Sequence, residues 1–174
     1  MLTFASADER ADQELLLDLL NTTPTTDGVR GDRLGDRTAA RTWAQTHGAR
    51  GSTKELQRIR DVRSALQAVV RGDESPTVLA PYVEGLRYRP AATADGLAWS
   101  LDASPDERLA TRAVLAWDGL HSQAPGRLRP CANDECTLFL IDRSKANNAR
   151  WCSMAVCGNR MKARRHYQRQ RGTR

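Results

Sequence analysis

The chain has 174 residues, of which 40% are hydrophobic and 28% are charged, and its formal net charge is +6. A chain of this length and apolar content can bury a sizeable core. It contains no apolar run that approaches the length of a membrane-spanning helix, which excludes that class of membrane protein.

Residues 1–126 predict one compact domain that is mainly helical. Apolar residues recur at helical spacing in four of its segments. These predicted helices lie around Leu15–Leu20 and over residues 39–46, 52–71 and 78–86. Ser52 followed by Glu55 is a capping-box pattern, which marks the start of the third helix.

A hairpin and a fifth helix complete this domain. Residues 86–89 and 97–101 read as short strands on either side of turn residues 93–96. Ser104, with Glu107 three positions later, is then predicted to cap a helix that ends near residue 121. The predicted domain therefore combines helices with one small antiparallel sheet.

No catalytic arrangement is recognisable in residues 1–126. His47 and His121 are isolated, and neither a Gly-rich phosphate loop nor a Ser-His-Asp motif occurs. Asn21 is expected to cap the first helix rather than to line a pocket. We therefore expect no enzyme, while an unknown small-molecule effector at this domain stays open as a partner.

The four cysteines all lie in the last 44 residues and form two pairs with equal spacing. They are Cys131, Cys136, Cys152 and Cys157. Two close pairs of thiolates can surround one Zn²⁺ ion at about 2.3 Å. Because four cysteines fill the coordination shell, the pattern predicts one structural zinc ion and no open catalytic position.

Disulfides and unrelated buried thiols are two alternatives to zinc that have less support. A secreted disulfide framework is expected with an apolar signal segment, whereas the first residues of this chain are charged. Four unrelated buried thiols would seldom share two equal spacings within one short basic segment. We therefore expect a zinc protein of the cytoplasm.

The cysteines are predicted to belong to a treble-clef-like finger. Residues 137–141 favour a strand and residues 142–148 a turn, so that the chain can return to the third cysteine. Ser153 is the predicted N-cap of a helix that begins between residues 154 and 157 and ends at Arg171. The complete chain is thus predicted to be α+β and mainly helical.

The predicted C-terminal helix separates apolar from basic side chains. Its narrow apolar face is expected to pack on the finger's hairpin and consists of Val156, Ala163 and Tyr167. The basic side chains form two stripes. One contains Lys162, Arg165 and Arg169, and the other Arg160, Arg164 and Arg171.

Charge is segregated along the chain. Residues 127–174 contain twelve basic and three acidic residues, whereas residues 1–126 contain fifteen basic and eighteen acidic residues. The resulting net charges of +9 and −3 favour a nucleic-acid partner for the C-terminal segment. A solvated helix face is the simpler alternative, because 24 of the 27 basic residues are arginines that occur in both halves. A membrane partner is not expected, since the helix lacks a broad apolar face.

The candidate nucleic-acid contacts come from the turn and from the C-terminal helix. They are Arg143, Lys145, Arg150, Arg160, Lys162, Arg164, Arg165, Arg169 and Arg171. Three of these, Lys145, Arg150 and Arg160, are close to the cysteines in sequence and could offset the −2 charge of a four-thiolate zinc site.

The cysteine segments resemble a known domain, the CGNR zinc finger, which occurs at the C-terminus of bacterial proteins with an expected role in DNA binding. The resemblance lies in the segments Arg129-Pro130-Cys131-Ala132-Asn133, Arg150-Trp151-Cys152-Ser153-Met154 and Cys157-Gly158-Asn159-Arg160. Asp18-Leu19-Leu20-Asn21-Thr22 resembles the N-terminal motif of ABATE, the domain that usually precedes this finger in stress-induced transcription regulators.

The resemblance implies that the four cysteines hold zinc and that the protein regulates transcription by binding DNA, in association with the nucleoid. Gly158 would let the backbone pass close to the metal, Asn159 would bond to the knuckle, and Arg160 would face a sulfur or a phosphate. Leu140, Ala146 and Ala149 depart from the family pattern and predict fewer phosphate contacts from the turn.

Three further questions stay open from the sequence alone. A short finger reads few bases, so useful specificity favours a homodimer, although no heptad pattern supplies one. The finger could instead be an RNA-binding or protein-interaction module, or a thiol sensor that releases zinc on oxidation. The operator, the regulated genes and the inducing signal are not encoded in any recognisable pattern.

Overall fold

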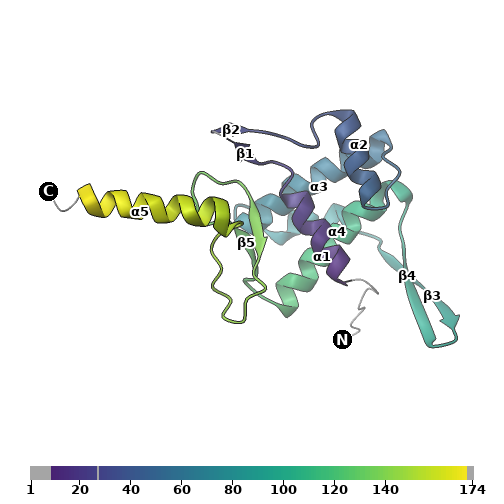
Figure 1. Ribbon diagram of the computed structural model, residues 1–174. Coiled ribbons are helices and arrows are strands. Elements are labelled where there is room, and N and C mark those ends of the chain that lie inside the picture. Colours follow the sequence, from purple (N-terminus) through teal and green to yellow (C-terminus); the bar gives the residue numbers. More distant parts are fainter. Residues whose placement is uncertain (1–8, 27, 172–174) are drawn as a thin grey trace.

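The computed structural model describes residues 9–26 and 28–171, and its fold is α+β and mainly helical, as predicted (Figure 1). The helices are α1 (Glu9–Leu20), α2 (Arg37–Thr46), α3 (Thr53–Arg71), the 3-10 helix η1 (Pro76–Tyr82), α4 (Pro105–Gln123), the π-helical turn η2 (Met154–Gly158) and α5 (Asn159–Arg171). Three antiparallel pairs of strands join β1 (Thr25–Thr26) to β2 (Val29–Arg30), β3 (Arg87–Thr93) to β4 (Gly96–Asp102), and β5 (Leu128–Pro130) to β6 (Phe139–Ile141).

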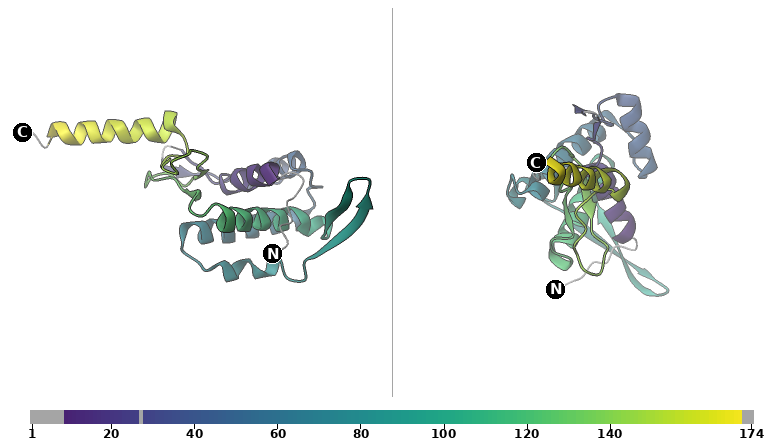
Figure 2. Two further views of the ribbon diagram at one scale, coloured as in Figure 1. Left: turned by 90° about the horizontal axis from the view of Figure 1, so that it is seen from below. Right: turned by 60° about the vertical axis from the view of Figure 1, so that its left-hand side comes forward.

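The core lies between α1, α3 and α4, which pack against one another (Figure 2). The four leucines that predicted the first helix are at most 1% exposed. The facing residues of α3 include Ile59, Val62 and Leu66, and α4 contributes Leu109 and Ala113. Burial of each large apolar side chain contributes about 1.5–3 kcal/mol, so this interface accounts for much of the stability.

The third helix begins and ends where its sequence predicts. The Ser52 hydroxyl accepts a hydrogen bond from the Glu55 backbone N–H at 3.1 Å, and Gly72 ends the helix in the left-handed conformation. The Glu55 carboxylate does not return to Ser52, as a complete capping box requires. It accepts instead from the backbone N–H groups of Arg50 at 3.0 Å and Gly51 at 2.6 Å.

One local prediction differs from the structure, and one local feature was not predicted. Residues 78–86 were expected to form a helix, whereas η1 is a 3-10 helix that spans Pro76–Tyr82. Pro81 lies inside this segment and has no N–H for an α-helical bond, which favours a short irregular helix. The pairing of β1 with β2 was not predicted, because two residues per strand are too few to show a period.

Two elements project from opposite ends of the molecule (Figure 2). The predicted hairpin is present as β3–β4, in which Tyr88 pairs with Leu101 and Thr93 with Gly96. The helix α5 points away from the helical core at the other end (Figure 1). In the part of the chain that the structure describes, no helix is both long and apolar enough to cross a membrane.

The hairpin β5–β6 connects the helical domain with the cysteines. Its two strands pair from Leu128 with Ile141 to Pro130 with Phe139. Strand β5 contacts α3 and β6 contacts α1. Phe139 is only 1% exposed and belongs to the same apolar cluster as the leucines of α1. The finger therefore contributes one strand pair to the core of the preceding domain.

Candidate metal centre and basic helix

The four cysteine sulfurs form one cluster, in which all of them lie within 4.8 Å of one another. The Cys136 and Cys152 sulfurs are 3.7 Å apart, as are those of Cys152 and Cys157. A tetrahedral zinc ion with Zn–S bonds of about 2.3 Å requires sulfur–sulfur distances of about 3.8 Å. The residues therefore fit one structural Zn²⁺ ion with four cysteine ligands.

Each pair of cysteines lies in a backbone turn that directs both sulfurs to the same point. Cys131 follows β5, and the Cys136 N–H closes the first turn by donating to the Asn133 carbonyl at 2.8 Å. Cys152 precedes η2, whose last turn contains Cys157. The Ser153 hydroxyl accepts from the Val156 N–H at 3.3 Å, which confirms it as the predicted N-cap.

Neutral donors surround the sulfurs. Asn133 is 1% exposed, and its side-chain amide donates to the Cys157 sulfur at 3.7 Å. The Cys152 N–H donates to the Cys131 sulfur at 3.5 Å. Such donors stabilise thiolates and orient them toward a metal. Asn133 was not among the residues predicted for this site, although its position two residues after Cys131 offered a signal.

Burial is one of two opposing influences on the pKa values of the thiols. It raises the pKa of Cys136 to about 11 and also raises the pKa of Cys152. Burial acts in the same direction at Cys157, but hydrogen bonds from Asn133 and the other thiols outweigh it and lower that pKa. Because zinc binds thiolates, metal binding releases the protons that these groups hold.

Gly158 and Asn159 of the Gly158-Asn159-Arg160 signature make local contacts in the π-helical turn. A Cβ atom on Gly158 would lie 2.8 Å from the Met154 sulfur and 3.3 Å from Trp151 Cδ1, so the absence of a side chain makes room for these two residues. The Asn159 side chain donates to the Ala155 carbonyl at 3.2 Å, within the π-helical turn and not to the knuckle.

Asn21 joins the first helix to the finger. Its backbone N–H bonds to the last turn of α1, as expected for a helix end. Its side-chain amide also donates to the Phe139 carbonyl at 3.2 Å, and its Oδ1 accepts from the Phe139 N–H at 2.8 Å. These two bonds reproduce the pattern of a paired β-strand residue. The position at the helix end was predicted from the sequence, whereas this long-range contact was not.

Further contacts on Thr137 and Phe139 hold the hairpin to the helical domain. The Thr137 hydroxyl donates to the Thr23 carbonyl at 2.7 Å. The Arg71 guanidinium donates to the Thr137 carbonyl at 3.1 Å and lies 4.5 Å from the centre of the Phe139 ring. Gln67 extends this set by donating to Thr23 Oγ1 at 2.8 Å. Helices α1 and α3 thus fix the finger at its hairpin.

The C-terminal helix does not pack on the hairpin, contrary to the sequence prediction. Val156 is 56% exposed and Tyr167 is 67% exposed, and α5 contains no buried residue. The apolar side of the hairpin faces α1 and α3 instead, as the burial of Phe139 shows. It therefore offers no apolar surface to α5. The helix contacts η2 at its start, and none of its residues is buried.

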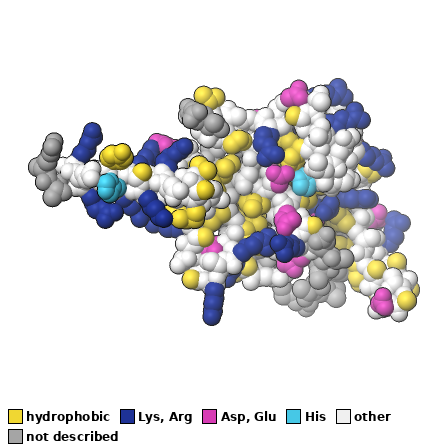
Figure 3. Space-filling view, in the orientation of Figure 1, with side chains coloured by type: hydrophobic (Ala, Val, Ile, Leu, Met, Phe, Trp, Pro, Cys, Tyr) yellow, Lys and Arg dark blue, Asp and Glu magenta, His cyan; other side chains and the backbone are white. Residues whose placement is uncertain are grey.

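The candidate contacts occupy two regions of the finger. Arg143, Lys145 and Arg150 are exposed in the turn after β6, and Arg150 lies 5.3 Å from the centre of the Trp151 ring. The other six are exposed on α5, where Lys and Arg side chains cover much of the visible surface (Figure 3). The three candidate residues in the turn after β6 therefore lie apart from the six on α5.

Among the described residues of the finger, Arg164 and Arg129 form ion pairs. Arg164 pairs with Glu135 of the knuckle, so part of its charge is compensated. Arg129 pairs with the buried carboxylate of Asp142. Hydrogen bonds from Ser144, followed by the backbone N–H of Ala149 and the charge of Arg129, lower the pKa of Asp142 to about 2 against the effect of burial. Asp142 thereby closes the turn that carries Arg143 and Lys145.

The comparisons with known proteins agree with this architecture. Residues 127–170 match the CGNR zinc finger. Residues 13–139 match ABATE, a family described as "Putative stress-induced transcription regulator". The two matches overlap on the hairpin that packs in the core. No curated protein matches the chain. The chain belongs to the ABATE family and carries a CGNR zinc finger after its helical domain.

Proposed function

We propose that the protein regulates transcription by binding DNA through α5, and that a structural zinc ion fixes the turn η2 from which this helix starts. The observation that carries this proposal is the composition and exposure of α5. Its thirteen residues include six Arg or Lys and no Asp or Glu, and none of them is buried. Such a helix gains little from packing on its own protein, whereas DNA phosphates neutralise its charge.

The dimensions of α5 suit a duplex. Thirteen residues extend over about 20 Å, and the major groove, about 12 Å wide, admits one α-helix. Arg165 and Arg169 are one turn apart and are our candidates for base contacts. Arg160, Lys162 and Arg171 are assigned to phosphates, and Arg164 shares its charge with Glu135. Turn residues Arg143, Lys145 and Arg150 are assigned to neighbouring phosphates.

The direction in which α5 leaves the protein supports a fixed geometry of binding. The bonds from Asn21 and Arg71 attach the finger's hairpin to α1 and α3. The sulfur cluster in turn joins this hairpin to the start of α5. We therefore propose that the helical domain determines where α5 lies on DNA.

The proposal includes a homodimer, because one finger reads too few base pairs for a unique site in a genome. It also places the protein in the cytoplasm on the nucleoid, with a role in stress responses, and assigns it no catalytic activity. Light scattering on the purified protein, with and without duplex DNA, measures the number of chains. A single chain on each DNA site would contradict the dimer.

Salt dependence of DNA affinity tests the proposed contact. About six phosphate contacts predict a log–log slope near −5 between the association constant and the salt concentration. The measurement is fluorescence anisotropy with a random-sequence duplex at several salt concentrations. An affinity that does not change with salt would contradict the phosphate mechanism. Tighter binding to single-stranded RNA of equal length would favour the RNA alternative.

A triple variant locates the contact on α5. Replacement of Lys162, Arg165 and Arg169 by Ala is expected to weaken DNA binding at least tenfold and to leave one zinc ion per chain, because these residues lie beyond the cysteine ligands. The matched control replaces the exposed pair Arg87 and Lys54 of the helical domain by Ala and should leave affinity within twofold. Equal affinity of triple variant and wild type would move the contact away from α5.

A thiol sensor is the second candidate, favoured by the half-buried Cys136 and Cys152 sulfurs, which are only 3.7 Å apart. Oxidation to a disulfide would bring these sulfurs to about 2.05 Å and remove two zinc ligands. A titration with hydrogen peroxide, followed by a zinc-release assay, tests this candidate. Retention of zinc at peroxide concentrations that oxidise free cysteine would dispose of it.

A further inference from the structure

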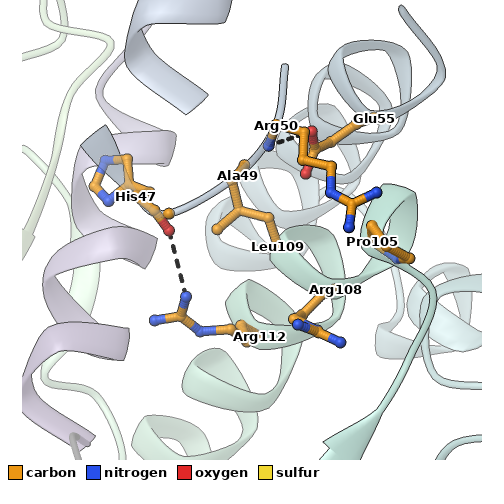
Figure 4. A pocket seen from close by; sticks show the side chains of 9 residues that line it. His47, Ala49, Arg50, Glu55, Pro105, Arg108, Leu109 and Arg112 are labelled. Carbon is orange, nitrogen blue, oxygen red and sulfur yellow. Dashed lines mark hydrogen bonds between the residues drawn. The ribbon is translucent and has the colours of Figure 1, made fainter. Parts of the chain in front are cut away.

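A small cavity lies on the helical domain, away from the finger, between the segment that joins α2 to α3 and the first half of α4 (Figure 4). Its volume is about 130 Å³. Pockets for drug-sized ligands measure about 300–1,000 Å³, so only a compact ligand fits. Ala49 and Leu109 supply apolar side chains at its centre (Figure 4).

Three guanidinium groups surround this cavity. Arg50 comes from the segment after α2, and Arg108 and Arg112 come from successive turns of α4. Within the described residues, Arg50 and Arg108 form no ion pair with a carboxylate. Arg112 is shared with Asp12, whose Oδ1 lies 2.6 Å from Arg112 Nη2. Two uncompensated cations and one partly compensated cation therefore face the same space.

Glu55 is the acidic residue among the described residues that line the cavity. The residue is 2% exposed, and its carboxylate already accepts the N–H groups of Arg50 and Gly51. The three guanidinium groups at the cavity exceed the two carboxylates of Glu55 and Asp12 by one positive charge. The cavity as a whole is consequently electropositive, although the helical domain around it has a net negative charge.

We propose that this cavity binds a small anion with carboxylate or phosphate oxygens. Guanidinium groups recognise such oxygens with paired, charge-assisted hydrogen bonds. Arg50 and Arg108 supply the charge, and the volume of about 130 Å³ favours a compact ligand over a nucleotide. Inorganic phosphate and short dicarboxylates share this chemistry, and both are probes for the site.

The cavity is connected with the helix that holds the finger. Arg112 Nη1 donates to the His47 carbonyl at 3.5 Å, and the His47 ring lies 3.0 Å from the Asp18 carboxylate. Asp18 is on α1, three residues before Asn21, whose side chain bonds to Phe139. An anion that draws Arg112 away from His47 or Asp12 therefore acts on the contacts of α1. This coupling to DNA binding rests on the proposed function; the anion site does not.

Calorimetric titration of the zinc-loaded full chain tests the site. The probes are sodium phosphate and sodium succinate, titrated separately at an ionic strength held constant with sodium chloride. The reference protein carries Lys162→Ala, Arg165→Ala and Arg169→Ala, so that phosphate binding to α5 does not contribute. We expect one saturable site for at least one probe.

Two variants made in this reference protein locate the site. Arg50→Gln combined with Arg108→Gln should weaken binding at least tenfold. Lys54→Gln removes an exposed cation next to Glu55 that does not line the cavity, and should change affinity less than twofold. Absence of saturable binding by both probes, or equal affinity of the double variant and the control, would overturn the anion site.

The coupling has a separate test on wild-type protein. Addition of the probe that binds should change DNA affinity at constant ionic strength, and the change should disappear in the Arg50→Gln, Arg108→Gln variant. An equal change in wild type and variant would show simple competition for α5 and overturn the coupling. If the protein binds no DNA at all, the proposed function fails while the calorimetric result stands.

Discussion

Asn21 shows at the residue scale how one side chain can replace a strand. Its amide group makes both hydrogen bonds that a neighbouring backbone would make to Phe139. Asn is suited to this role, because its amide has a donor and an acceptor side by side. Phe139 is buried, so loss of these partners would leave its peptide groups without hydrogen bonds inside the protein.

Asn21→Ala is expected to lower the free energy of unfolding by about 2–4 kcal/mol, because two buried backbone groups lose their partners. Asn21→Asp keeps the acceptor for the Phe139 N–H but not the donor for its carbonyl, and should show an intermediate loss. Asn148→Ala, on an exposed turn, is the control. Urea denaturation measures all three. An Ala variant as stable as wild type would refute this role.

Asp18 predicts how stability depends on pH. A hydrogen bond with His47 is the main cause that lowers the pKa of Asp18, assisted by Trp43 and Arg33 and opposed by burial. A lowered pKa in the folded state means that the carboxylate stabilises the protein above its unfolded pKa of 3.8. This contribution is lost as the pH falls below that value.

Asp18→Asn should therefore destabilise the protein at pH 6 by about 1 kcal/mol or less, because the Asp18 side chain is 37% exposed and solvent screens its interactions. The difference from wild type should shrink as the pH falls toward about 3. Urea denaturation of both proteins across this range gives the difference at each pH, so that effects shared by both proteins, such as loss of zinc, cancel. A difference that grows on acidification would contradict the assignment.

At the element scale, α5 depends on the metal rather than on packing. It has thirteen residues, and isolated helices shorter than about 12–15 residues are marginal in water. Its many like charges weaken it further. The zinc site compensates by fixing η2 at the start of the helix, because Cys157 lies in that turn. Metal binding and helix formation are therefore coupled in this segment.

Cys152→Ser should abolish binding of zinc at one ion per chain and should unfold α5, because a serine hydroxyl does not replace the thiolate. Helices α1, α3 and α4 should remain folded, since no cysteine lies in them. Zinc analysis and hydrogen exchange with mass spectrometry measure the two effects. Retention of one zinc ion per chain would show that the ligand set is wrong.

At the scale of the whole molecule, the helical domain and the finger share one core. The finger's Phe139 is packed among leucines of α1, and Leu128 and Ile141 pack against the same cluster. Division of the chain at residue 126 separates the acidic segment from the basic one. The same division assigns Phe139, Leu128 and Ile141 to the finger, although they pack in or against the core of the helical domain. The overlap of the two family matches over residues 127–139 has the same explanation.

A chain that ends at residue 126 should be less stable than one that ends at residue 142. Loss of the buried Phe139 ring alone is expected to cost about 1.5–3 kcal/mol. The shorter chain should also bind a hydrophobic dye, because the leucine cluster is uncovered. Thermal unfolding and dye fluorescence make the comparison, and equal stability of the two chains would show that the hairpin does not support the core.

Local sequence patterns were sufficient to predict several helices and strands and the four metal ligands. Cysteine spacing identified the four sulfurs that the structure brings within 4.8 Å, and the Ser52 cap located α3. Segregated charge pointed to the finger as the basic segment. These features depend on residues that are close in sequence, so their physical cause can be read from spacing alone.

The tertiary structure decided where the apolar hairpin packs and hence where α5 points. The bonds of Thr137 and Phe139 reach residues 114 and 118 positions away along the chain, and no local period encodes such contacts. The helix face of Val156 and Tyr167 has an apolar pattern that could pack on the hairpin, yet α1 and α3 already cover that surface. Competition between distant surfaces for one apolar strand pair, and not the pattern of either segment, determined the outcome.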